Sequence, residues 1–144
     1  MLVLVLCKIR ILIDCRVAID LNEVSTVHKN NESIQLDIEL LEGYVQSLGV
    51  DVVKQMFTLY SQQVTIYLDD IESSLVNDSE QLWQEHCHKM KGAAGSVGLK
   101  ALHARLKLME RTTADASDKV RQLADLKTHN KQAITDFSDW LICI

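Results

Sequence analysis

The apolar residues between positions 83 and 97 recur at alternating steps of four and three, as Trp83, Cys87, Met90, Ala94 and Val97. This spacing follows the turn of an α-helix and places all these side chains on one face. The chain contains no proline and only 5 glycines, so little in it interrupts long helices. We therefore expect an all-α protein in which this face contacts a core.

The residues before this segment predict two more helices. A short helix is expected from about residue 36 to 47, with Asp37 as its N-cap and Gly49 ending it. A long helix is expected from about residue 50 to 76, because its apolar residues follow a near-heptad spacing. Ser79 is then the predicted N-cap of the helix that contains the 83–97 face, and Gly98 is predicted to end that helix.

The residues after Gly98 complete the pattern. A further helix is expected over about 99–112, followed by a loop at 113–117. Ser117 or Asp118 is the predicted cap of the final helix, in which Lys127 and Asn130 interrupt an apolar stripe made by Val120, Leu123, Ile134, Phe137 and Leu141. Four long helices joined by short loops predict an antiparallel up-down-up-down four-helix bundle with a short additional N-terminal helix.

Length and composition fit one domain, which we place at residues 34–144. Residues 1–33 are interpreted as a linker or a cloning-derived segment; Leu2 to Ile13 is apolar but too short to span a membrane, and would form a strand or an added helix if it folds. The net charge of -5 argues against a nucleic-acid ligand and favours a protein partner. The 4 cysteines lack metal-binding spacing, which suits a reducing cytosol.

His88 is the residue that suggests a chemical function. On a helix it lies far from the apolar stripe and is therefore expected to be exposed, with Gln84, Lys91, Gly92 and Gly95 around it. A glycine inside a helix lowers helix stability by about 0.8–1 kcal/mol relative to alanine. Neither Gly92 nor Gly95 is expected to face the core, so core packing does not explain them. Small residues beside an exposed imidazole, with a cation one turn away, indicate a histidine that carries a phosphoryl group.

The same residues carry a family resemblance. His88, Lys91, Gly92 and Gly98 resemble the signature of histidine-containing phosphotransfer (HPt) domains, and the string Lys-Gly-Ala-Ala-Gly-Ser-Val-Gly-Leu at 91–99 carries the same resemblance. The resemblance extends over roughly 36–144. The string at 91–99 resembles the C-terminal HPt modules of tripartite hybrid sensor histidine kinases, such as those of the anaerobic-respiration and trimethylamine-N-oxide sensor type.

The resemblance implies a phosphorelay intermediate of a two-component system. His88 would accept a phosphoryl group from a receiver-domain aspartate and pass it to a response-regulator aspartate. An imidazole must be neutral to attack, which the ordinary histidine pKa of about 6.5 permits at pH 7. Lys91 would stabilise the phosphoryl charge, and Glu110 would either orient the imidazole or form a surface ion pair with a lysine. The partner-binding positions would be Gln84, Glu85, Gly92 and Gly95.

The resemblance also implies which components lie outside this chain. The domain would bind no cofactor or metal, because the receiver would supply Mg²⁺, and it would have no ATP-dependent kinase activity of its own. We expect a monomer that contacts the receiver of the hybrid kinase and a cognate response regulator, without nucleic acid or membrane insertion. It would be the cytoplasmic C-terminal module of an inner-membrane sensor, although the sequence leaves a free-standing protein open.

Three other interpretations remain to be weighed against this one. A non-catalytic helical adaptor would bind a receiver-like partner without moving a phosphoryl group. A complete histidine kinase would need a glycine-rich nucleotide loop and an ATP-binding domain, which the sequence lacks. A zinc site at His86, Cys87 and His88 is disfavoured, because side chains two apart on a helix point in divergent directions.

Overall fold

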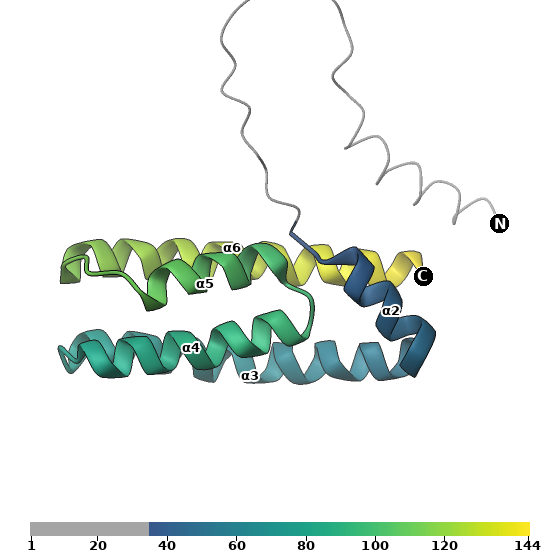
Figure 1. The fold of residues 1–144 in the computed structure, drawn as a ribbon, viewed down its shortest axis with the longest axis horizontal. Coiled ribbons are helices and arrows are strands. Elements are labelled where there is room, and N and C mark those ends of the chain that lie inside the picture. The colour runs from purple at the N-terminus through teal and green to yellow at the C-terminus, as the bar shows by residue number, and fades with distance from the viewer. Residues whose placement is uncertain (1–34) are drawn as a thin grey trace, which may run out of the picture.

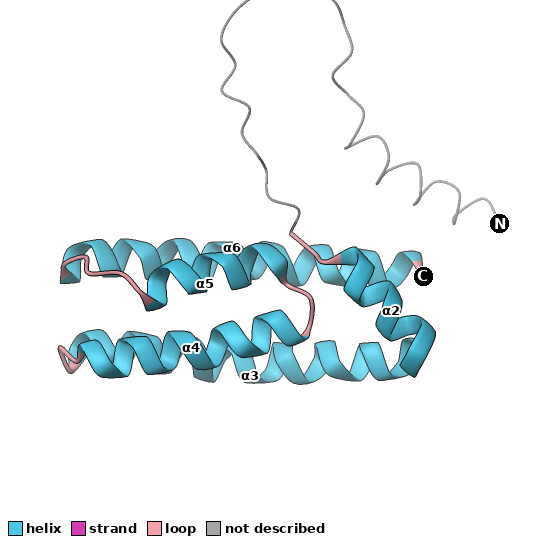
Figure 2. Ribbon diagram, viewed as in Figure 1, coloured by secondary structure: helices cyan, strands magenta, loops and turns pink. Residues whose placement is uncertain are grey.

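The structure is a computed structural model that describes residues 35–144. Within this range it contains five helices and no strand (Figure 2). They are α2 (Ile38–Leu48), α3 (Val50–Val76), α4 (Glu80–Ser96), α5 (Lys100–Glu110) and α6 (Ala116–Cys143). The predictions for residues 1–33 lie outside the described residues.

Helices α3 to α6 form the predicted antiparallel bundle, and α2 lies across one end of it (Figure 1). The turn between α4 and α5 is at the same end as α2, whereas the α3–α4 and α5–α6 turns are at the other end (Figure 1). No helix within 35–144 combines the length and apolar character needed to cross a bilayer. The fold class expected from the sequence is therefore confirmed.

Local capping explains where the helices begin. Asp37 accepts a hydrogen bond from the Leu40 amide at 3.2 Å, and Ser79 accepts one from the Leu82 amide at 3.3 Å, as predicted. Gly49 and Gly98 follow α2 and α4 with φ of 87° and 73°, a conformation that favours glycine. At Gly98 a side chain would also meet Leu41 of α2, whose Cδ2 lies 3.0 Å from an ideal Cβ position.

The described chain enters the bundle beside the α4–α5 turn. The Asp37 amide donates to the Gly98 carbonyl at 2.8 Å, and the Ala101 amide donates to the Gln35 carbonyl at 3.3 Å. These two hydrogen bonds join the residues before α2 to the turn that follows α4 and to the first turn of α5. The residues that lead into α2 are therefore fixed against the turn between α4 and α5.

The core includes every member of the predicted 83–97 stripe. It is formed by inward side chains of all five helices, the largest being Trp83, Phe137, Leu41, Ile71 and Met90. Burial raises the pKa of the Cys87 thiol to about 12, so this cysteine packs as a small apolar group.

The last two helices differ from the predictions in their bounds. Asp115 caps α6, accepting from the Asp118 amide at 2.9 Å, so Ser117 and Asp118 lie inside the helix and neither is the cap. An acidic side chain at 118 then occupies the first turn, where the helix dipole favours it. Helix α5 ends at Glu110 instead of 112, because the next two amides bond to carbonyls only three residues back.

The buried face of α6 also differs from its predicted stripe. Val120 is 55% exposed, whereas the polar residues Lys119 and Asn130 are buried at inward positions. Asn130 accepts a hydrogen bond from the Tyr60 hydroxyl at 2.8 Å, and burial raises the pKa of Tyr60, so the phenol stays protonated and can donate. Lys119 and Asn130 thus occupy two inward positions where apolar side chains are usual, and each has a polar partner on another helix.

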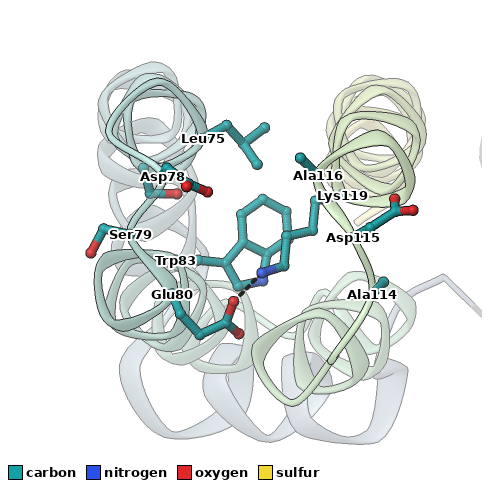
Figure 3. Close-up of a pocket in the computed structure, with 10 residues that line it drawn as sticks. Leu75, Asp78, Ser79, Glu80, Trp83, Ala114, Asp115, Ala116 and Lys119 are labelled. Carbon is teal, nitrogen blue, oxygen red and sulfur yellow. Dashed lines mark hydrogen bonds and ion pairs between the residues drawn. The ribbon is translucent and has the colours of Figure 1, made fainter.

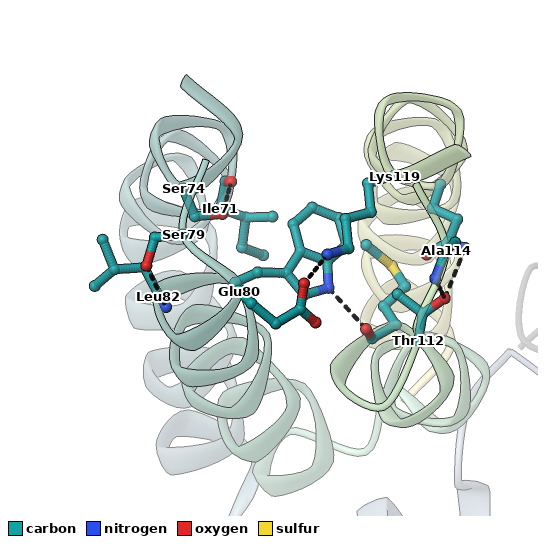
Figure 4. Close-up of polar contacts among 11 residues, drawn as sticks. Ile71, Ser74, Ser79, Glu80, Leu82, Thr112, Ala114 and Lys119 are labelled. Carbon is teal, nitrogen blue, oxygen red and sulfur yellow. Dashed lines mark hydrogen bonds and ion pairs between the residues drawn. The ribbon is translucent and has the colours of Figure 1, made fainter. Parts of the chain in front are cut away.

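A cavity of about 220 Å³ lies between the α3–α4 and α5–α6 turns (Figure 3), which are at the end of the bundle opposite α2 (Figure 1). Lys119 lies 5.4 Å from the centre of the Trp83 ring and pairs with Glu80 (Figure 3). Ser79 with Leu82, Ser74 with Ile71, and Thr112 with Ala114 make further hydrogen bonds nearby (Figure 4). Of the side chains that line this cavity, Glu80 and Lys119 pair with each other, and the Ser74 and Ser79 hydroxyls bond to the backbone of α3 and α4.

Candidate phosphohistidine site

His88 lies on the outer surface of α4, where its side chain is 68% exposed. Its Nδ1 atom is 2.6 Å from Oε1 of Glu110, at the end of α5. The neighbouring Cys87 side chain is buried in the core. The helix therefore presents the imidazole to a partner while α5 contacts one of its two nitrogens.

Glu110 also binds Lys91, whose Nζ donates to the second carboxylate oxygen. The hydrogen bond from Lys91 is the main cause that lowers the pKa of Glu110, and the contact with His88 lowers it further. Partial burial acts in the opposite direction but is outweighed. The carboxylate is therefore ionised at neutral pH and accepts hydrogen bonds. The structure brings His88, Lys91 and Glu110 together in one group, in which Glu110 both contacts the imidazole and pairs with Lys91.

The contact with Glu110 fixes which nitrogen of a neutral His88 carries the proton. An ionised carboxylate can only accept, so the Nδ1 atom must donate to it. In the neutral ring the Nε2 atom then has a free lone pair. Because the ring is exposed, that lone pair is available to an electrophile on another molecule.

The two glycines near His88 have different surroundings. No atom lies within 4 Å of a Cβ built on Gly92, so this position is open. A Cβ built on Gly95 would lie 3.0 Å from Cδ2 of His103 on α5. Although neither glycine was expected to face the core, Gly95 lies at a contact between two helices, because α5 approaches α4 closely there. The missed signal was His103, which lies on the same face of α5 as Glu110.

The other predicted partner-binding positions, Gln84 and Glu85, are exposed on α4. Glu85 pairs with Lys89 at 3.0 Å, and the hydrogen bond from Lys89 lowers the pKa of Glu85. Neither residue makes a hydrogen bond to His88 among the contacts of residues 35–144. Their role as partner-binding residues stays a prediction.

The His86, Cys87 and His88 side chains diverge. His86 lies between α3 and α4 with its Nδ1 3.9 Å from Asp70, Cys87 is buried, and His88 faces Glu110. In the part of the chain that the structure describes, no group of three His, Cys, Asp or Glu side chains is placed to bind a metal ion.

The glycine surroundings give a paired prediction on stability. Gly92→Ala should stabilise the domain by about 0.5–1 kcal/mol, because it restricts the unfolded chain and improves helix propensity without a clash. Gly95→Ala should gain less or destabilise, because the new methyl group must displace His103. Urea denaturation of both variants measures the difference in the free energy of unfolding. In a His103→Ala background, Gly95→Ala should stabilise the domain as much as Gly92→Ala does. Equal stabilisation by both single variants would contradict the close approach.

A second prediction concerns Glu110 and pH. The pKa of Glu110 is lowered below its ordinary value of 4.5 in the folded protein, so its ion pair stabilises the fold above that pH. Glu110→Gln should therefore cost about 1 kcal/mol near pH 7. The difference from wild type should shrink as the pH falls below 4.5, through the folded pKa. Parallel urea titrations of both proteins test this; a difference independent of pH would contradict the ionic contact.

Comparison with known proteins agrees with this geometry. Residues 55–137 match the sequence model of the Hpt domain. The chain is 33% identical over 79 residues to the aerobic respiration control sensor protein ArcB of Escherichia coli K12, and equally to that of Shigella flexneri. The match covers 55% of this chain and 10% of each sensor, so the chain spans about a tenth of these curated relatives.

Solved structures give the same result for the fold. The solution structure of the histidine-containing phosphotransfer domain of anaerobic sensor kinase ArcB from Escherichia coli aligns with a TM-score of 0.68 and 27% identity, over 81% of this chain and 96% of that one. A second structure of the ArcB domain aligns with a TM-score of 0.68 and 24% identity, over 75% of this chain and 93% of that one. The alignment with the family covers more than half of the sequence, and this chain therefore belongs to the family of Hpt domains, the histidine-containing phosphotransfer domains.

Proposed function

We propose that this chain is a phosphorelay intermediate in which Nε2 of His88 accepts a phosphoryl group from the aspartyl phosphate of a receiver domain. The observation that supports this most directly is the exposed His88 ring with Nδ1 placed 2.6 Å from a carboxylate. In the proposed step the Nε2–P bond forms as the acyl phosphate P–O bond breaks. The receiver's aspartate leaves as a carboxylate.

Glu110 contributes to both directions of this transfer. Attack by Nε2 leaves a positive charge on the imidazole ring, whose Nδ1 proton points at the Glu110 carboxylate. When the group passes on to a response-regulator aspartate, the N–P bond breaks and the neutral ring returns. Glu110 is thus a positioning residue that favours the same ring tautomer before and after each transfer.

Lys91 provides the second charge near the reaction. Its ammonium group is bound to Glu110 and its side chain is 19% exposed. Phosphoryl transfer depends mainly on alignment and on stabilising charge on the equatorial oxygens. A phosphoryl group on His88 would give Lys91 a second anionic partner. The receiver would supply Mg²⁺ and most of the remaining stabilisation, and this chain would bind no cofactor.

The parent protein and its place in the cell belong to the same proposal. The relatives that this chain matches are sensor proteins of which it spans about a tenth. We infer a cytoplasmic module of a larger membrane-bound hybrid sensor, monomeric in itself, that contacts that sensor's receiver and a response regulator. Co-purification of the domain with receivers from the same organism, with its mass in solution measured by light scattering, tests this assignment.

The direct test exposes the purified chain to receiver domains phosphorylated with acetyl phosphate and Mg²⁺. We expect the mass of one phosphoryl group to be added at His88, as an adduct that is labile in acid and stable in base. ATP and Mg²⁺ alone should leave the protein unmodified. Labelling by ATP alone, or an adduct on another residue, would contradict the proposal.

Gly92 allows the surface beside His88 to be tested separately. Gly92→Ala should reduce the rate of transfer by about tenfold while the fold becomes more stable, because the methyl group obstructs a receiver loop that must approach closely. Rates are measured by quench-flow with one phosphorylated receiver. Gln81→Ala, on the exposed face of α4 near its N-terminus, is the matched control and should transfer at the wild-type rate. If Gly92→Ala transfers at the wild-type rate, the absence of a side chain at position 92 is not needed for transfer.

A further inference from the structure

Charge is divided unevenly between the helices. Residues 80–111, which contain α4 and α5, carry six Lys and Arg residues against three Glu. The other described residues carry five basic against thirteen acidic side chains. The net charge of -5 for the whole chain therefore hides a basic helix pair on an otherwise acidic domain.

Helix α5 presents part of this charge along its edge next to α4. Lys100, His103, Lys107 and Glu110 follow one another at steps of three, four and three, which places them on one face of the helix. Two of them fix the direction of that face, because His103 lies against Gly95 and Glu110 contacts His88. Lys107 lies between them, one turn from Glu110, and Lys100 continues the line.

The two lysines on this face differ from the other lysines of the helix pair. Lys91 is bound by Glu110 and Lys89 by Glu85. Lys100 and Lys107 are exposed, and no carboxylate among residues 35–144 lies within 4.0 Å of either of them. Lys100 is also the first residue of α5, whose first turn has no acidic side chain. A cation there opposes the helix dipole, so helix stability gives no reason for it.

We propose that Lys100 and Lys107 form an electrostatic docking stripe that attracts the acidic surface around the phosphoacceptor aspartate of a receiver domain. This inference rests on the proposed function. A site that binds Mg²⁺ next to an aspartate must gather several carboxylates, and a phosphoryl group adds negative charge. The stripe runs along the helix that carries Glu110, so it guides such a surface onto His88. Long-range attraction of this kind acts mainly on the association rate.

The experiment compares two double variants with the same change in charge. Lys100→Glu/Lys107→Glu reverses the stripe, and Lys54→Glu/Lys131→Glu reverses two exposed lysines on α3 and α6. Second-order rate constants for transfer are measured with phosphorylated receivers at limiting concentration, from about 20 to about 500 mM salt. We expect reversal of the stripe to slow transfer about tenfold at low salt and to remove its salt dependence. The control should behave like wild type, and the rate at saturating receiver should not change.

The outcomes separate this inference from the proposed function. If His88 is phosphorylated but both double variants transfer like wild type, the stripe is wrong and the phosphorelay stands. If no receiver phosphorylates His88, binding of the same fluorescently labelled receivers by anisotropy tests the stripe alone. If only Lys100→Glu/Lys107→Glu loses binding, the stripe is supported. If both double variants and wild type bind equally, or none of them binds, the stripe is wrong. Tighter binding of a labelled DNA oligonucleotide than of any receiver would overturn it as well.

Discussion

His88→Gln is expected to abolish phosphoryl acceptance without unfolding the domain. The glutamine amide nitrogen has no available lone pair, so no nucleophile remains where Nε2 stood. The side chain is 68% exposed, so its replacement should change the free energy of unfolding by no more than about 0.5 kcal/mol. Intact mass after incubation with a phosphorylated receiver measures acceptance, and urea denaturation measures stability.

The same variant decides between the relay and the adaptor interpretation. In the relay, wild type and His88→Gln bind a receiver with similar affinity, but only wild type acquires the acid-labile adduct. His86→Gln is the matched control, since it removes the other imidazole of the 86–88 segment and should leave acceptance intact. If receivers bind both proteins and no phosphoryl group moves to either, the domain is an adaptor.

Trp83→Ala is expected to lower the free energy of unfolding by about 3–5 kcal/mol. The Trp83 ring is 1% exposed, and its indole N–H donates to the Met109 carbonyl at 2.8 Å. Truncation would leave a cavity between α4 and the other helices, together with a buried carbonyl that has lost a partner. Urea denaturation followed by circular dichroism gives the difference.

Two further variants show which part of the Trp83 contact matters. Trp83→Phe retains an aromatic ring and loses the donor, so it should cost less than Trp83→Ala. Gln84→Ala, at the adjacent exposed position, should remain within about 0.5 kcal/mol of wild type. A cost below about 1.5 kcal/mol for Trp83→Ala would contradict its central place in the core.

The periodicity of apolar residues was sufficient to predict the bundle, because each helix buries one face. It failed on α6, where Lys119 and Asn130 are buried and Val120 is exposed. Polar side chains at inward positions are favourable only when a partner lies opposite, and those partners, Glu80 and Tyr60, come from other helices. A pattern within one helix contains no information about them. The N-cap of α6 was equally ambiguous, because three neighbouring residues had side chains able to cap it.

The site was predictable to the extent that it lies on one helix. His88, Lys91 and Gly92 share a face of α4, which the spacing of their residues determines. The close approach of α5 at Gly95 was not predictable, because it depends on how two helices pack and on where His103 lies. Glu110 was predicted only through the family resemblance. Its bond to Lys91 required the three-dimensional arrangement, since 19 positions separate the two residues.

The attachment of Gln35 and Asp37 to the α4–α5 turn has a consequence for tethered partners. Gly98 is ten residues from His88, which corresponds to about 15 Å along a helix. Gln35 and Asp37 are therefore held at about this distance from the imidazole, on the side from which a domain joined upstream would be connected. Tethering of this kind raises the effective concentration of one receiver over its free competitors, by an amount that the length of the connecting segment sets. Choice between receivers would then depend partly on covalent connection, in addition to surface complementarity.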